Sequence, residues 1–252
     1  VNPLTYMRTQ LLGLGIPCTT HTERNIINLF TGQFKTGSSK AGFKDALLCD
    51  EVVDGLQISA VFREALENEG FRDMVEDYVK VGFQRNQKYY SQRYEEASFT
   101  LYQKYTYEDV CQLMEWETSI VPLNIGGYKY DEATKTYPVF INYDKGEDIA
   151  DTIRYEDKLL SPQQLIAISK SGVDLMNNLV QKALHAKEEN ITMHLFIRKN
   201  KNDEDGAKEF YYLGHIHATG DTEVFTMPGT TKKAVRIMYD LETPIREDLY
   251  DY

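Results

Sequence analysis

The segment Asn124–Asp131 holds residues suited to contact with a planar molecule. Its two adjacent glycines allow the backbone to bend or to approach a ligand closely. In an extended segment Tyr128 and Tyr130 share one face and Lys129 lies on the other. Because tyrosine offers a flat apolar ring and a hydroxyl, the pattern fits a surface that stacks on a ring. The pattern alone, however, favours a tyrosine-rich core with polar loops over such a site.

Two later segments add polar groups that could complete such a site. Tyr155–Lys158 brings an aromatic ring and carboxylates, and Ser169–Ser171 brings two hydroxyls. Asp151, Glu156 and Lys158 also allow a different interpretation, a Mg²⁺-dependent nuclease in which carboxylates hold the metal and the lysine assists the attacking water. A solvated acidic turn explains the same residues more simply.

Three histidines are candidate metal ligands. His215 and His217 alternate onto one face of an expected strand, and His194 lies on a probable neighbour of that strand. Imidazoles placed in this way could bind zinc or copper. No fourth ligand is evident from the sequence, and ordinary strand histidines explain the pattern, so no metal is assigned.

Motifs for several common enzyme classes are absent. The sequence has no GxxxxGK[ST] phosphate loop, no GxGxxG and no GxSxG. Nucleotide hydrolysis, dinucleotide chemistry and α/β-hydrolase chemistry therefore have no support. The sequence predicts no catalytic residue in this chain.

The first part of the chain has the period of amphipathic helices. Thr20 and Glu23 have capping-box spacing ahead of an apolar pattern, and Val61–Leu66 and Phe71–Phe83 repeat apolar residues at helical intervals. We therefore expect residues 1–95 to form a helical domain, a small bundle that serves as a connector.

In the second part the period changes to two. A hairpin is expected from Gly126–Asp131 and Tyr137–Tyr143, and a short strand at Ser98–Tyr102. Ser161-Pro162 could cap a helix, but Leu165–Ile168 could equally be a strand. Further helices are expected after Thr106 and over Val173–Lys187, and further strands over Ile191–Arg198, Glu209–His217 and Lys233–Leu241. Residues 96–252 should form a β-rich domain, so the fold class is α+β, with a helical bundle followed by a curved sheet or small barrel with flanking helices.

Charge limits the partners that the second domain can bind. Residues 1–95 carry 11 basic and 12 acidic side chains and residues 96–252 carry 17 and 27, so the second part holds a net charge of −10 of the total −11. An acidic surface repels DNA in general, so DNA binding here needs a local basic patch and a specific pocket. The 18 tyrosines against one tryptophan are consistent with such a pocket.

Composition and cysteines point to a cytoplasmic protein. No apolar run approaches the roughly 20 residues of a membrane span, and no membrane partner is expected. Cys18, Cys49 and Cys111 form no CxxC pair, and we expect them to be buried and reduced. The chain starts at Val1 without a signal peptide, and we interpret it as an excerpt from a longer polypeptide.

From about Tyr102 onward the chain resembles a known family. It is similar to the C-terminal domain that follows a phospholipase-D-type nuclease and a superfamily-2 helicase in type IV, modification-dependent restriction enzymes of the SauUSI type. The residues before Tyr102 resemble the helical connector of that family. The matching segments are Tyr105–Val110, Asn124–Tyr128, Val139–Tyr143, Ile153–Asp157, Ile168–Ser171 and Glu209–Gly214.

The resemblance implies an SRA-like fold of the PUA-like group, which binds DNA that carries 5-methylcytosine or 5-hydroxymethylcytosine. The expected mechanism is base flipping into an enclosing pocket. Tyr128, Tyr143 and Tyr155 are the candidate stacking walls, Asp157 is the acceptor for the cytosine amino group, and Ser169 and Ser171 are candidates for O2 or N3. Ala167 and Ile168 stand where related sequences often have an aromatic, which implies a stacking wall from elsewhere or weaker base binding.

Further expectations concern phosphates and partners. Lys129, Lys145, Arg154 and Lys170 are the candidate phosphate-binding residues. The fragment itself is expected to bind rather than cleave and to need no cofactor, whereas ATP and Mg²⁺ belong to the upstream helicase and nuclease domains of an ATP-dependent restriction endonuclease active in phage defence. A protein-interaction module within a helicase complex is a third alternative.

Overall fold

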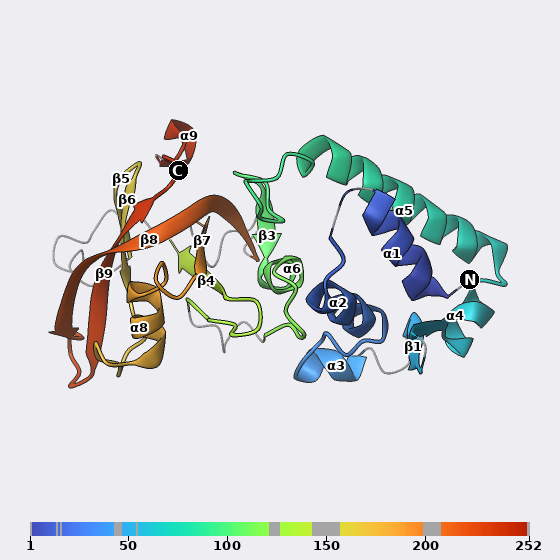
Figure 1. Cartoon of the computed structure of the whole chain (residues 1–252), viewed down its shortest axis with the longest axis horizontal. Coiled ribbons are helices and arrows are strands. Elements are labelled where there is room, and N and C mark those ends of the chain that lie inside the picture. The colour runs from blue at the N-terminus through green and yellow to red at the C-terminus, as the bar shows by residue number, and fades with distance from the viewer. Residues whose placement is uncertain are drawn as a thin grey trace. The chain divides into compact units, whose positions relative to one another are not determined.

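The computed structural model describes residues 2–13, 15, 17–42, 47–53, 55–120, 127–142, 157–198 and 208–250. They form two compact units, Val1–Gln92 with Tyr107–Val121, and Arg93–Thr106 with Pro122–Tyr252 (Figure 1). The predicted domain boundary between residues 95 and 96 stays a prediction, because the first unit also includes the later segment Tyr107–Val121. Within the described ranges, no helix combines the length and the apolar character that a membrane crossing requires.

The first unit consists mostly of helices. In chain order it contains α1 (Pro3–Gly13), α2 (Thr20–Phe30), α3 (Ser38–Gly42), β1 (Cys49–Val52), β2 (Gly55–Ile58), α4 (Ala60–Ala65), α5 (Glu69–Tyr89) and α6 (Tyr107–Leu113). The expected helices at Thr20, Val61 and Phe71 are all present. The capping box of α2 lies one residue earlier than predicted, since the Thr19 hydroxyl accepts from the Thr22 amide and the Thr22 hydroxyl accepts from the Thr19 amide.

The predicted helical bundle is not confirmed. The small core of the first unit joins Leu4 and Ile27 to Cys49 and Leu56, which lie on the antiparallel pair β1 and β2. Helix α5 contributes no buried residue. The helical period of α5 correctly predicted a helix, but it did not show whether the apolar face is covered.

The second unit is built on one seven-stranded sheet. Its strands are β3 (Lys104–Thr106), β4 (Thr136–Asn142), β5 (Lys158–Ser161), β6 (Gln164–Ile168), β7 (Thr192–Arg198), β8 (Glu209–Thr226) and β9 (Lys233–Leu241), with helices α8 (Asn178–Leu184) and α9 (Glu247–Tyr250). The order is β4-β7-β8-β9-β6-β5, and β3 pairs with β8. No described pairing joins β5 to β4, so the sheet is not closed into a barrel.

Several predicted elements change in extent or type. Leu165–Ile168 forms a strand, which was one of the two alternatives predicted for this segment. Ser98–Tyr102, which was predicted to be a strand, does not form one. The expected hairpin before β4 is reduced to isolated bridges, Tyr128 with Val139 and Asp131 with Thr136. β4 instead pairs in parallel with β7, which no local pattern indicated. Helix α8 is shorter than predicted and β8 is longer.

Both faces of the sheet are covered where β4 and β7 pair. Alternate residues such as Val139 and Leu195 enter the main core, which α8 closes with Val180 and Ala183. The residues between them, such as Phe140 and Phe196, stack on the opposite face at 5.1 Å between ring centroids. Because each strand is buried on both sides, its sequence is almost continuously apolar rather than alternating.

Gly214 bends β8 and changes which residues face the core. The β7–β8 register shifts beside it, and its φ of 90° lies in the left-handed region that favours glycine. A Cβ at this position would lie 3.2 Å from Cζ of Tyr94. The bend leaves Ile216 in the main core and turns His215 and His217 to the other face.

We predict that Gly214→Ala destabilises the sheet more than Gly220→Ala. Both glycines have a positive φ, of 90° and 88°, but only Gly214 has a neighbour within 4 Å of an added Cβ. The backbone strain shared by both variants should cost about 1–2 kcal/mol, and crowding against Tyr94 should add about 1–3 kcal/mol to Gly214→Ala alone. Urea denaturation, monitored by far-UV circular dichroism, measures the free energy of unfolding of both variants. Equal midpoints for the two variants would contradict the close approach of Tyr94.

Candidate functional site

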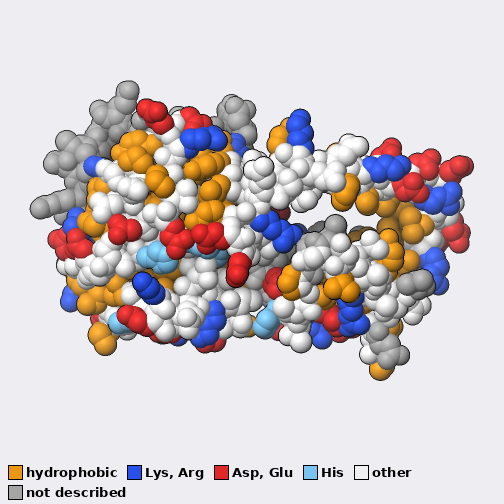
Figure 2. Space-filling view, turned by 45° about the horizontal axis from the view of Figure 1, so that its top comes forward, with side chains coloured by type: hydrophobic (Ala, Val, Ile, Leu, Met, Phe, Trp, Pro, Cys, Tyr) orange, Lys and Arg blue, Asp and Glu red, His pale blue; other side chains and the backbone are white. Residues whose placement is uncertain are grey.

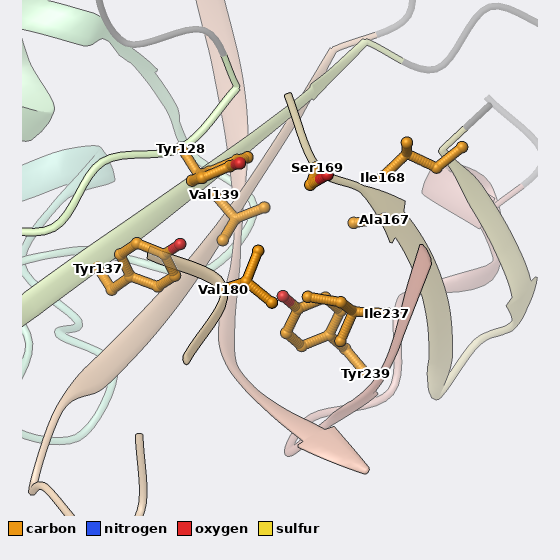
Figure 3. Close-up of a pocket in the computed structure, with 9 residues that line it drawn as sticks. All are labelled: Tyr128, Tyr137, Val139, Ala167, Ile168, Ser169, Val180, Ile237 and Tyr239. Atoms are coloured by element: carbon orange, nitrogen blue, oxygen red, sulfur yellow. The ribbon is translucent and has the colours of Figure 1, made fainter. Parts of the chain in front are cut away.

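A small hollow opens among β4, β6, β9 and α8 in the second unit (Figure 3). Its volume is about 20 Å³, which is room for about one water molecule. Its lining is aromatic and aliphatic with one hydroxyl, and consists of Tyr128, Tyr137, Val139, Ala167, Ile168, Ser169, Val180, Ile237 and Tyr239. A planar ring of nucleobase size does not fit the hollow unless its walls move.

Tyr128 stands at the edge of this hollow because its neighbours fix the backbone on both sides. Gly127 has a φ of 91°, and its carbonyl accepts the Phe140 amide at 2.6 Å. The Tyr128 hydroxyl accepts the Lys170 amide at 3.0 Å, so the segment before β4 is joined to the end of β6. Burial raises the pKa of this hydroxyl, which therefore keeps its own proton near neutral pH.

Two tyrosines that the sequence did not single out complete the aromatic lining. Tyr137 lies on β4 with its ring 6.0 Å from the ring of Tyr128, at 64° between planes. Tyr239 lies on β9, and Figure 3 shows it across the hollow from Tyr128. Burial raises the pKa of both hydroxyls. The alternation of Val235, Ile237 and Tyr239 in the expected strand was the signal that places Tyr239 on the core side.

The wall of the hollow also includes the two positions at which the resemblance led us to expect an aromatic residue. Ala167 and Ile168 both line the hollow. In the β6–β9 ladder Ala167 is opposite Ile237, and Leu165 is opposite Tyr239. Aromatic surface therefore comes from the neighbouring strand and from β4, as the resemblance allowed.

The polar groups predicted for base contacts have structural partners. The Ser169 amide donates to the Val235 carbonyl and its hydroxyl accepts the Val235 amide, both at 2.8 Å. Ser169 thus extends the β6–β9 ladder. Oδ1 of Asp157 accepts the Ile168 amide at 2.7 Å. Ser171 is exposed in the turn that follows β6 and does not line the hollow.

Two of the predicted phosphate-binding lysines lie beside the hollow. The ammonium of Lys170 lies 5.1 Å from the centre of the Tyr128 ring. Burial lowers the pKa of Lys170, and the nearby charge of Lys129 lowers this pKa further. The structure therefore brings Lys129 and Lys170 together with Tyr128.

The remaining predicted site residues lie outside the described residues. These are Tyr143, Tyr155, Lys145 and Arg154, together with Asp151 and Glu156 of the nuclease alternative. Lys158, the third member of that alternative, is exposed on β5. The three cysteines are free thiols, but Cys18 is exposed and only Cys49 and Cys111 are buried, so the prediction that all three are buried was wrong for Cys18.

Two family models together match most of the chain. A model described as "Domain of unknown function (DUF3427)" matches residues 99–252. A second, "Domain of unknown function (DUF8090)", matches residues 4–91. The chain belongs to the first of these families. Nothing among the curated proteins matches it.

Solved structures with some likeness include methylated-DNA complexes. The SUVH5 SRA domain with hemi-methylated CG DNA is 12% identical over 58% of this chain and 91% of that chain, with a TM-score of 0.38. The DNA recognition domain of the cytosine modification-dependent restriction endonuclease LpnPI is 11% identical over 56% and 72%, with a TM-score of 0.37. Arabidopsis thaliana SUVH6 is 12% identical over 92% and 39%, with a TM-score of 0.39. These TM-scores are too low to establish a shared fold, so the SRA-like fold stays a proposal.

We predict that Lys129→Ala raises the pKa of Lys170. The change removes the like charge that disfavours the protonated ammonium, whereas the part of the shift due to burial remains. Titration of ¹³Cε-lysine signals by NMR measures this pKa directly. Lys187→Ala, at an exposed position in the turn after α8, is the matched control and should leave the Lys170 titration unchanged. An unchanged Lys170 pKa in Lys129→Ala would show that the two ammonium groups are not neighbours.

Proposed function

We propose that this chain is the DNA-recognition fragment of a modification-dependent, type IV restriction enzyme with an SRA-like fold. Its ligand is double-stranded DNA that contains 5-methylcytosine or 5-hydroxymethylcytosine. The observation that carries the proposal is the hollow beside Tyr128, where aromatic rings line the wall and the ammonium of Lys170 lies over the Tyr128 ring, with the charge of Lys129 nearby. The motif resemblance supplies the matching ligand, one flipped cytosine.

The aromatic rings that line the hollow are the proposed stacking surfaces for a flipped base once the hollow opens. The rings of Tyr128 and Tyr239 offer stacking area on opposite sides (Figure 3). Stacking contributes about 1–3 kcal/mol per base, and this offsets the few kcal/mol that flipping costs. Asp157, whose Oδ1 accepts the Ile168 amide, supplies the carboxylate that suits the cytosine amino donor.

Binding requires the hollow to open. At about 20 Å³ it accepts a water molecule, so a base enters only when the Tyr128 ring moves outward. That movement breaks the hydrogen bond between the Tyr128 hydroxyl and the Lys170 amide. The freed Lys170 segment then lies beside the DNA backbone, so base entry and phosphate contact are one coupled event.

Electrostatics make this patch the place where DNA approaches. The second part of the chain has a net charge of −10, so phosphates are repelled from most of it. Lys129 and Lys170, together with Lys145 and Arg154, are the proposed local exception. Affinity then depends on the pocket, because a small basic patch alone supports weak binding.

The fragment itself is proposed to bind DNA without cleaving it. Nuclease and helicase domains in the same polypeptide, with their ATP and Mg²⁺, would act on the DNA that the fragment marks. The apolar residues that α5 exposes, including Tyr78, Val79 and Phe83, support a contact between the first unit and such domains. The absence of a disulfide among Cys18, Cys49 and Cys111 supports a reducing, cytoplasmic setting.

We predict that the chain binds a short duplex with 5-methylcytosine at least about 10-fold more tightly than the unmodified duplex, since the pocket acts only on a base that it can hold. Tyr128→Ala should reduce this preference by about 10-fold or more, because it removes one stacking surface. Asp157→Asn should reduce it as well, because an amide replaces the anionic acceptor. Fluorescence anisotropy at fixed moderate salt measures all of these affinities.

The matched control is Tyr78→Ala, which removes an exposed tyrosine of α5 in the other unit and should leave the preference intact. Equal affinity of the unaltered chain for both duplexes would refute the proposal. The same reactions with Mg²⁺ test the nuclease alternative. Cleavage that Glu156→Ala abolishes would assign that activity instead.

A further inference from the structure

Four side chains with metal-ligand atoms gather on the face of β8 that points away from the main core. Nδ1 of His215 lies 3.2 Å from Oε2 of Glu242 and 3.4 Å from Oε2 of Glu95. In the described part of the chain, these three residues form a group that could hold a metal ion, because their ligand atoms all lie within 4.8 Å of one another. Nε2 of His217 contacts the other oxygen of Glu242. All four residues belong to the second unit.

The fold brings these residues together from three segments. The bend at Gly214 turns His215 and His217 to the same side of β8, and the Glu242 amide donates to the His215 carbonyl at 3.1 Å just after β9 ends. The Tyr94 ring packs on Gly214 and lies 5.0 Å from the His215 ring. Glu95, the next residue, is held at a φ of 49°, a left-handed conformation that non-glycine residues seldom adopt.

The two carboxylates of the cluster carry negative charge on oxygen atoms that accept hydrogen bonds and cannot donate them. Within the described ranges neither glutamate forms an ion pair with lysine or arginine, and both contact histidine side chains. Nε2 of His215 is buried without a hydrogen-bond partner there, so Nδ1 is the ring nitrogen that meets the carboxylates. A neutral imidazole whose Nδ1 lone pair faces two carboxylates would be repelled. The neutral tautomer with its proton on Nδ1 can donate to one carboxylate at a time, whereas a divalent cation among the four side chains would accept lone pairs from both carboxylates and both imidazoles.

We propose that Glu95, His215, His217 and Glu242 form a site for a divalent transition metal of the zinc type. Two imidazoles and two carboxylates are a donor set that suits Zn²⁺. Ligands at about 2.1 Å from a tetrahedral metal lie about 3.4 Å from one another. Two of the separations, 3.2 Å and 3.4 Å around Nδ1 of His215, are close to that value.

The metal would fasten three segments of the second unit to one another. Glu95 lies in the stretch that leads into β3, the histidines lie on β8, and Glu242 follows β9. The side chain of His215 is 12% exposed, whereas those of Glu95 and His217 are 57% and 47% exposed. The site is therefore accessible from solvent, and Figure 2 shows histidine side chains next to acidic ones on the face in view. The proposal is independent of DNA binding.

Titration of the tag-free chain with Zn²⁺ by isothermal calorimetry, after dialysis against a chelator, tests the site. The background is Cys18→Ser, because the exposed Cys18 thiol could itself bind zinc. We expect one equivalent to bind and the Tm to rise with Zn²⁺ concentration. Co²⁺ in place of Zn²⁺ should give the intense visible bands of a four-coordinate site.

Glu95→Gln and His217→Ala should each weaken Zn²⁺ binding by about 10-fold or more. Both side chains are largely exposed, so these variants should fold, which circular dichroism checks. His185→Ala is the matched control, because His185 pairs with Glu188 at 2.9 Å elsewhere in the unit, and it should bind zinc normally. Absence of one-to-one binding, or unchanged affinity in both Glu95→Gln and His217→Ala, would overturn the site.

Discussion

The pairing of β8 with three neighbours is the constraint on which the rest of the second unit depends. This strand of 18 residues pairs with β3, β7 and β9, so its path fixes where the other strands lie. A regular strand of this length would keep one set of side chains on one face throughout. The bend at Gly214 interrupts that alternation. As a result the core face supports the hollow beside Tyr128, and the opposite face carries the cluster around His215.

The polar groups near the hollow serve the fold before they can serve a ligand. The Ser169 hydroxyl and the Asp157 carboxylate both complete backbone hydrogen bonds at the end of β6. A buried amide without a partner costs about 1–3 kcal/mol, so these contacts are not given up without replacement. The Tyr128 hydroxyl likewise accepts a backbone hydrogen bond, from the Lys170 amide. A ligand that enters the hollow must supply equivalent hydrogen bonds, and this requirement favours a base with both donors and acceptors over an apolar molecule.

Charge is arranged in opposite ways at the two proposed sites. Burial lowers the pKa of Lys170 and the charge of Lys129 lowers it further, and an anion beside the two lysines would relieve this repulsion. Glu95 and Glu242 pose the opposite problem, which protons or a metal cation relieve. Among the described residues, no ion pair joins either group of like charges to a lysine, arginine, aspartate or glutamate of opposite sign. We propose that each group takes up an external partner, phosphate in one case and a cation in the other.

Local sequence determined the elements and several of the residues that lie near one another. Helical and alternating periods gave α2, α4, α5 and the strands β7 and β9, and adjacent glycines drew attention to Tyr128, because such patterns depend only on neighbouring residues. Tertiary structure alone decided the parallel pairing of β4 with β7, the place of Tyr239 across from Tyr128, and the approach of Glu242 to His215. These contacts join residues far apart in the chain, and they depend on which strands pair and where a bend shifts the alternation. Neither the choice of partner strand nor the position of the bend is encoded in a short window of sequence, because burial and pairing energies are set by the partner strand.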